Sequence, residues 1–142
     1  MKKRRLLVEN NYDFQLMGIV APMRAYKMVW YINQAMRIAF AKQKECTVHP
    51  FGREPIDISF YTYEAPYGNY RFIENRAVKS PKGEIHYLIP ELKEFDFLLY
   101  VQGEMHKDYF ERLKNGLEQL SIVHYFKIFE VDRIKAKENL IF

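Results

Sequence analysis

Residues 97–101 (Phe-Leu-Leu-Tyr-Val) constrain the fold of this chain more than any other segment. Consecutive apolar residues place hydrophobic side chains on both faces of a strand, which is typical of a strand inside a sheet. We therefore predict a central strand over residues 97–103. Residues 107–120 have apolar residues at helical spacing and charged residues between them, which predicts an amphipathic helix. A last strand over residues 122–131 would complete a β-α-β unit.

The N-terminal half predicts a second strand and helix. Residues 14–20 are expected to form a strand that ends before Pro22. Residues 23–42 are expected to form a helix, because Met28, Ile32 and Met36 recur on one face of a 3.6-residue period. Together these two elements resemble the start of another β-α-β unit.

The middle of the chain predicts an antiparallel meander. Residues 43–54 are expected to be irregular, and further strands are expected at residues 56–63, 70–78 and 84–89, the last after a turn at residues 80–83. The predicted class is α+β: a two-layer sandwich with a mainly antiparallel sheet, two amphipathic helices and ferredoxin-like β-α-β halves (residues 14–63 and 97–131) with an inserted hairpin. One face of the sheet would remain uncovered by helices.

The composition indicates one domain over residues 1–142, with a basic tail at residues 1–5. Aromatic residues reach 16% of the 142 residues, and Phe and Tyr favour the half-buried surfaces of sheets. The lone Cys46 excludes an internal disulfide framework and fits a reducing compartment. Neither a signal-peptide core nor a membrane-length apolar run is present, so we expect a cytoplasmic protein.

The positive charge is concentrated in the N-terminal portion. Four of the 22 basic residues lie at positions 2–5, so the rest of the chain has 18 basic and 18 acidic residues. Residues 1–53 hold ten basic and three acidic residues, while residues 54–142 hold twelve and fifteen. A basic field over the whole domain is therefore absent, and the uneven distribution of charge bears on which partners the chain could bind.

A short motif resembles the signature of a known family. Its residues are Ile89, Pro90, Glu91 and Asp96. The spacing resembles that of the bacterial IPExxxVDY family, with Phe95 where that pattern has Val and Phe97 where it has Tyr. Residues 12–14 and 137–142 also resemble that family. The resemblance implies a small, single-domain, cytosolic bacterial protein with no assigned activity.

Signatures of enzymes and metal sites are missing. The chain has no glycine-rich phosphate loop, no Cys-x-x-Cys, no His-Glu-x-x-His and no Gly-x-Ser-x-Gly. Cys46 and His49 lie three residues apart, but a Cys–His pair is assembled by the fold and not by sequence proximity. The other histidines, His86, His106 and His124, are dispersed, and His124 fits a core or boundary position. We predict no catalytic residues, no metal and no cofactor.

The outer side of the first helix is the candidate interaction face. With Arg24 at 0° and about 100° per residue, a mixed set of residues falls opposite the apolar face at roughly 200–300°. Together with Arg24, this set comprises Tyr26, Lys27, Trp30, Gln34 and Arg37. Such residue types suit a protein interface or single-stranded RNA. Alternatively, Trp30 packs beneath residues 43–54, or Arg37 stacks over it.

The motif carboxylates have two interpretations. Glu91, Glu94 and Asp96 could act in acid–base chemistry or bind a cationic ligand. In the interpretation that we favour, Pro90 fixes a corner and Asp96 holds the bend by hydrogen bonds.

The sequence favours a non-enzymatic binding or regulatory module. Its protein contacts, including self-association as a homodimer, would use the uncovered sheet face together with the Trp30 face. The alternative is an accessory RNA-binding protein that uses the basic N-terminal portion. An enzyme that uses Glu91, Asp96 or a histidine is a third hypothesis, and no membrane association is expected.

Overall fold

The computed structural model describes residues 14–66, 68–78, 83–103 and 107–142, and for residues 107–110 only the backbone is considered. The basic tail at residues 1–5, the motif-like Tyr12 and Asp13, His106 and most of the predicted turn at residues 80–83 lie outside the described residues.

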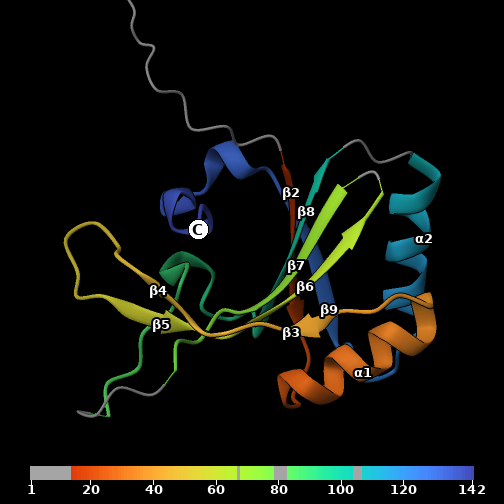
Figure 1. The fold of residues 1–142 in the computed structure, drawn as a ribbon, viewed down its shortest axis with the longest axis horizontal. Coiled ribbons are helices and arrows are strands. Elements are labelled where there is room, and N and C mark those ends of the chain that lie inside the picture. Colours follow the sequence, from red (N-terminus) through yellow and green to blue (C-terminus); the bar gives the residue numbers. More distant parts are fainter. Residues whose placement is uncertain (1–13, 67, 79–82, 104–106) are drawn as a thin grey trace, which may run out of the picture.

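Within these ranges the chain forms one six-stranded sheet, in the order β3-β6-β7-β8-β2-β9, and a separate two-stranded sheet, β4-β5 (Figure 1). The strands are β2 (Phe14–Val20), β3 (Ala41–Lys42), β4 (Cys46–Val48), β5 (Ile56–Ile58), β6 (Phe60–Ala65), β7 (Gly68–Glu74), β8 (Phe97–Gly103) and β9 (Tyr125–Phe129), and the α-helices are α1 (Ala25–Met36) and α2 (Lys107–Glu118). All paired strands are antiparallel, which confirms the predicted α+β class.

β8 lies inside the sheet, as its apolar sequence predicts. Its Leu99 is opposite Met17 of β2 on one side and Phe72 of β7 on the other. β2 and β7 are both antiparallel to β8 and therefore parallel to each other, so the order β9-β2-β8-β7 has the directions of a ferredoxin-like sheet. The prediction for the first β-α-β half, residues 14–63, is wrong in one respect. Its second strand was expected at residues 56–63, but β7 is the strand that lies beside β8 in the sheet. β6 and β3 extend the edge beyond β7.

α1 ends earlier than the 3.6-residue pattern predicts. Arg37 adopts a left-handed conformation with φ 55°, and its N–H donates to the Asn33 carbonyl. The Asn33 side chain then accepts from the Phe40 N–H at 2.9 Å and donates to the Phe40 carbonyl at 3.2 Å. These bonds end the helix at Met36. Phe40 therefore packs in the core, and the next two residues form β3.

Both helices cover the same face of the sheet (Figure 1). Met28 and Ile32 of α1 and Leu113 and Leu117 of α2 are almost fully buried against odd-numbered β8 residues such as Leu99. Gly116 lets the helices approach, because a Cβ there would clash with the Sδ atom of Met36. The helical layer of the predicted sandwich is therefore present.

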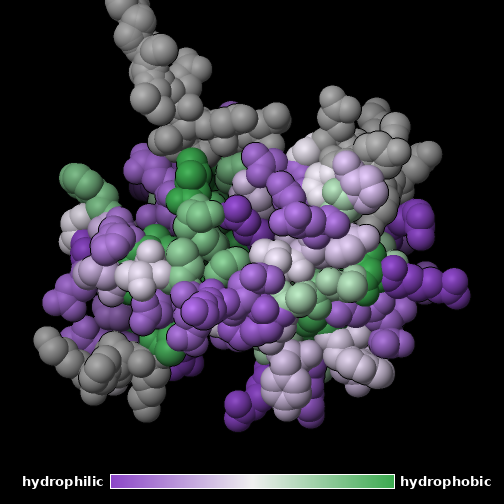
Figure 2. Space-filling model, viewed as in Figure 1, coloured by the Kyte–Doolittle hydropathy of each residue, from purple (hydrophilic) through white to green (hydrophobic). Residues whose placement is uncertain are grey.

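The opposite face of the sheet is covered too, contrary to the prediction of an open face. The 3-10 helices η1 (Pro90–Leu92), η2 (Val131–Arg133) and η3 (Lys137–Leu140), with β4 and β5, lie on this side (Figure 1). Their buried apolar residues Ile89, Val131 and Leu140 pack in one cluster with Leu16 and Leu98 of the sheet. In the same view, a band of hydrophobic residues reaches the surface beside these segments (Figure 2). The face predicted for self-association therefore packs internally.

Two predicted strands and one segment that was predicted to be irregular also differ. The strand at residues 56–63 is broken at Ser59 into β5 and β6, and residues 84–89 form only one bridge, between Arg76 and Tyr87. The segment at residues 43–54 contains β4, which pairs with β5.

In the described part of the chain, no helix is long and apolar enough to cross a membrane.

Candidate functional site

The six candidate residues of the first helix all lie on the surface. Arg24, Tyr26, Lys27, Trp30, Gln34 and Arg37 are exposed along α1 and its two caps, and we refer to them as the α1 outer face. Tyr26 and Trp30, one turn apart, are each 57% exposed. The structure thus brings the candidate residues onto one continuous helix surface.

Trp30 has little internal support. With 57% of its surface exposed, it is not packed beneath residues 43–54. Among the described residues its ring makes one aromatic contact, with Tyr31, edge to face at 5.2 Å, and no guanidinium stacks over it. Tyr31 is itself 38% exposed and was not among the candidate residues, although it lies next to this sector on the helical wheel. Large aromatic surface is therefore available on α1.

The family-like motif is bound to the rest of the fold through Asn75, which sequence reasoning missed. Asn75 is fully buried, and its Oδ1 accepts the Ile89 N–H at 2.9 Å. Its Nδ2 donates to the carbonyls of Leu92 at 2.9 Å and Phe95 at 3.2 Å. No signal in the sequence marks it, because Asn75 stands between the charged residues Glu74 and Arg76, just after β7. The Asn75 side chain thus ties the motif segment to the end of β7, in addition to the backbone bridge between Arg76 and Tyr87.

The motif carboxylates accept backbone hydrogen bonds. Glu91 accepts the N–H groups of Lys135 at 3.0 Å and Ala136 at 2.9 Å, which ties η1 to the segment between η2 and η3. Asp96 Oδ2 accepts the Ala21 N–H at 2.9 Å, at the turn between β2 and α1. These contacts are the kind that the structural interpretation of the motif requires.

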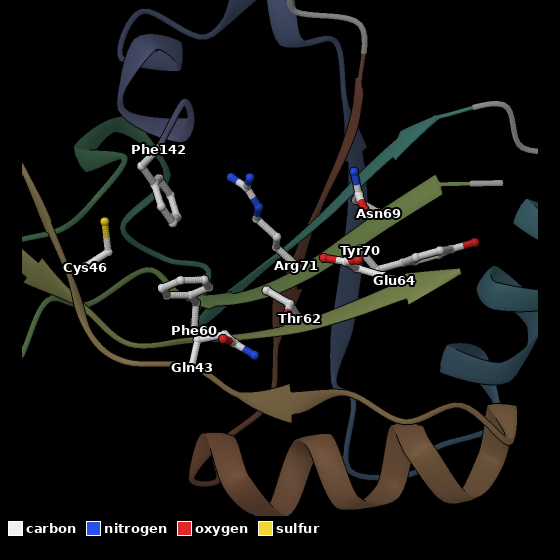
Figure 3. Close-up of a pocket in the computed structure, with 9 residues that line it drawn as sticks. All are labelled: Gln43, Cys46, Phe60, Thr62, Glu64, Asn69, Tyr70, Arg71 and Phe142. Carbon is white, nitrogen blue, oxygen red and sulfur yellow. The ribbon is translucent and has the colours of Figure 1, made fainter. Parts of the chain in front are cut away.

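One hollow lies on the β6-β7 surface of the second face, with a volume of about 310 Å³, and we call it the Arg71 hollow. Figure 3 shows its lining residues Gln43, Cys46, Phe60, Thr62, Glu64, Asn69, Tyr70, Arg71 and Phe142. The Arg71 side chain projects into it beside the Phe142 ring, while the Tyr70 ring points the other way (Figure 3). Among the described lining residues, the charged side chains are Arg71 and Glu64, one cation and one anion.

Aromatic rings hold the Arg71 guanidinium in place. Its Cζ lies 4.9 Å from the centre of the Tyr100 ring and 5.1 Å from that of Phe142. Burial raises the pKa of Tyr100, and the Arg71 charge opposes that shift. Such contacts orient a guanidinium and stabilise it, which accounts for the position of Arg71 without any ligand.

A second hollow, of about 350 Å³, lies where α1 begins, and we call it the α1 hollow. Its lining joins part of the α1 outer face to a motif residue and to strand residues far away in the sequence. The lining residues are Met23, Arg24, Ala25, Tyr26, Lys42, Ser59, Tyr61, Glu74, Arg76, Asp96 and Phe97. Sequence reasoning missed this site, because no local motif connects its members.

Two acidic groups of the α1 hollow have shifted pKa values. Burial raises the pKa of Glu74, with Lys42 opposing the shift and Glu45 adding to it. Burial, together with the nearby Glu74 carboxylate, raises the pKa of Tyr61. The Lys42 ammonium lies 5.6 Å from the centre of the Tyr61 ring. The hollow is thus a partly desolvated site in which charges act more strongly than in water.

The groups considered for nucleophilic or metal chemistry do not assemble. Cys46 donates weakly to the Thr47 carbonyl at 3.8 Å, and no contact between Cys46 and His49 occurs in the part of the chain that the structure describes. His86 pairs with Glu84 at 3.2 Å, and His124 is exposed just before β9, so the expected core position of His124 is wrong. The described residues hold no group of three or more His, Cys, Asp or Glu arranged for a metal ion.

Comparison with protein-family models, curated proteins and solved structures finds no match for this chain. The resemblance to the IPExxxVDY family therefore stays a prediction.

Proposed function

We propose that this protein is a non-enzymatic binding module whose α1 outer face contacts an acidic surface of another protein. The observation that carries the proposal is the exposure of Tyr26 and Trp30, 57% each, on adjacent turns of one helix. Trp, Tyr and Arg are the residue types that most often dominate binding energy at protein interfaces. All three types are exposed together here, at Tyr26, Trp30 and Arg37.

The charge around these aromatics favours an acidic partner. Residues 14–44 contain no Asp or Glu, and their cations are Arg24, Lys27, Arg37, Lys42 and Lys44. A symmetric dimer through the α1 outer face would bring the cations of both copies together, which costs free energy. A different protein with acidic residues around an apolar pocket fits the same surface without that cost.

The test is affinity capture of tagged protein from native cells after nuclease treatment, compared between wild type and the Trp30→Ala variant. Phe51→Ala is the matched control, because Phe51 is 97% exposed and lies outside α1. We expect nuclease-resistant protein partners with wild type and the Phe51 control, and their loss with Trp30→Ala. Equal recovery with all three proteins would contradict the assignment of the face.

A second candidate function is binding of single-stranded RNA by the same surface. Tyr26 and Trp30 could stack on bases while Arg24, Lys27 and Arg37 neutralise phosphates. Affinity for a homopolymeric RNA would then fall steeply with salt and fall further when Lys27 and Arg37 are changed to Gln. Weak binding that Trp30→Ala does not alter would reject this candidate and leave the protein interface.

A further inference from the structure

The α1 hollow contains a helix N-terminus without a cap. Arg24 occupies the N-cap position but makes no side-chain capping bond, and the first turn contains no acidic residue. The first helical bonds begin with the Lys27 and Met28 N–H groups, which both donate to the Arg24 carbonyl. The N–H groups of Ala25 and Tyr26 have no acceptor in the described residues, and both residues line the hollow. Free N–H groups and the helix dipole attract an anion at this end.

Ser59 provides an independent sign of a ligand. It is only 8% exposed, yet its hydroxyl has no hydrogen-bond partner among the described residues, although its carbonyl accepts the Glu74 N–H. Its neighbours Ile58 and Phe60 pack in the cluster on the second face, so the Ser59 side chain points to the helix side and into the α1 hollow. A buried hydroxyl without a partner is unfavourable unless something else satisfies it.

The charged side chains around the hollow are three cations and two carboxyl groups. Arg24, Lys42 and Arg76 supply the positive charge. Asp96 accepts the Ala21 N–H, and Glu74 is the other carboxyl group of the lining, so three cations face two carboxyl groups. The balance favours a negatively charged ligand.

We infer that the α1 hollow binds the phosphate monoester group of a small molecule. The hollow offers many hydrogen-bond donors: two free N–H groups, the Ser59 hydroxyl and three cationic side chains. These are more donors than the two oxygens of a carboxylate accept, whereas a phosphate monoester has three terminal oxygens. The hollow's volume of about 350 Å³ leaves room for the group esterified to the phosphate.

This site shares Arg24 and Tyr26 with the proposed protein interface, but its other lining residues lie outside the α1 outer face. Ser59, Lys42 and Arg76 do not belong to the α1 outer face, so substitutions there leave Trp30 and its neighbours unchanged. Loss of phosphate binding and loss of partner capture are therefore separable results.

The experiment is an amide-shift titration of the ¹⁵N-labelled protein with inorganic phosphate, phenyl phosphate and acetate. Saturable shifts at Ala25 and Tyr26 are expected with both phosphates and much weaker binding with acetate. Arg76→Gln should raise the Kd for phenyl phosphate about tenfold, since it removes a charged donor. Lys93→Gln is the control, because Lys93 is exposed, lies outside the hollow and should bind as wild type does.

Ser59→Ala separates ligand binding from folding. It should weaken phenyl phosphate binding severalfold while leaving the melting temperature unchanged or raised, because the hydroxyl has no internal partner to lose. Three results would overturn the inference: no saturable shift at Ala25 and Tyr26, acetate binding as tight as that of the phosphates, or binding of inorganic phosphate without phenyl phosphate. Equal weakening by Lys93→Gln would show that only surface charge attracts the anion and would overturn it too.

Discussion

Replacing Asn75 with Ala should destabilise the fold more than any other single polar substitution that we consider. The substitution leaves the buried Ile89 N–H without an acceptor and removes one donor each from the Leu92 and Phe95 carbonyls. An unsatisfied buried backbone group costs about 1–3 kcal/mol. Asn75 has 0% exposure, so these groups have no access to bulk water. The partial loss at the two carbonyls and the void left by the amide raise the expected total to about 3–5 kcal/mol.

Urea unfolding measured by circular dichroism gives this cost as a shift in the midpoint at constant slope. Asn139→Ala is the matched control, because Asn139 is also buried but its side chain makes one bond, to the Leu88 carbonyl at 2.8 Å. We expect the control to cost about 1–2 kcal/mol. If Asn75→Ala costs no more than Asn139→Ala, the view that Asn75 anchors the motif segment is wrong.

Three further substitutions test other contacts. Glu91→Gln should lower the free energy of unfolding by about 1 kcal/mol, because the amide has only one acceptor oxygen for the N–H groups of Lys135 and Ala136. A melting curve identical to that of wild type would argue against a structural role for Glu91. Gly18→Ala should lower the free energy of unfolding by about 1–3 kcal/mol despite the better strand propensity of Ala, since the new Cβ would lie 2.7 Å from ring atoms of Phe95 and Phe129. A variant that is more stable than wild type in thermal melts would refute this close packing. Glu74→Gln should stabilise the protein more at neutral pH than at about pH 4. Burial raises the pKa of Glu74 above its ordinary 4.5, so the folded state favours the protonated form and loses stability as the pH rises through the folded-state pKa. A variant-minus-wild-type melting difference that does not grow with pH would show that Glu74 is solvated.

The sequence predicts the parts of the fold that local pattern determines. The apolar run at residues 97–101 gives the central strand β8, and the helical spacing of Leu113 and Leu117 gives α2. The end of α1 was mispredicted, because the pattern Met28, Ile32, Met36 continues to Phe40. The helix instead stops where the Asn33 side chain binds the Phe40 backbone, a contact that periodicity does not encode.

The covering of the second sheet face could not be predicted for a similar reason. Val131, Ile134 and Leu140 have neither the period of a strand nor that of a long helix, and they become core residues only because Glu91 and Asn139 bind this segment to η1 and its surroundings. Of the candidate site, the α1 outer face follows from the helical wheel, since its residues are near in sequence. The α1 hollow does not, because Ser59, between β5 and β6, and Arg76, after β7, come from segments far apart in the sequence.

The most direct test of the proposed binding function is site-specific photocrosslinking in living cells. A photoreactive phenylalanine analogue is placed at position 30 in one protein and at position 51 in another, and adducts are analysed after nuclease treatment. We predict a discrete protein adduct from position 30 and none from position 51, with an acidic protein as the captured partner. Equal adducts from both positions, an adduct with RNA alone, or no adduct from position 30 would contradict the proposal that the α1 outer face binds another protein.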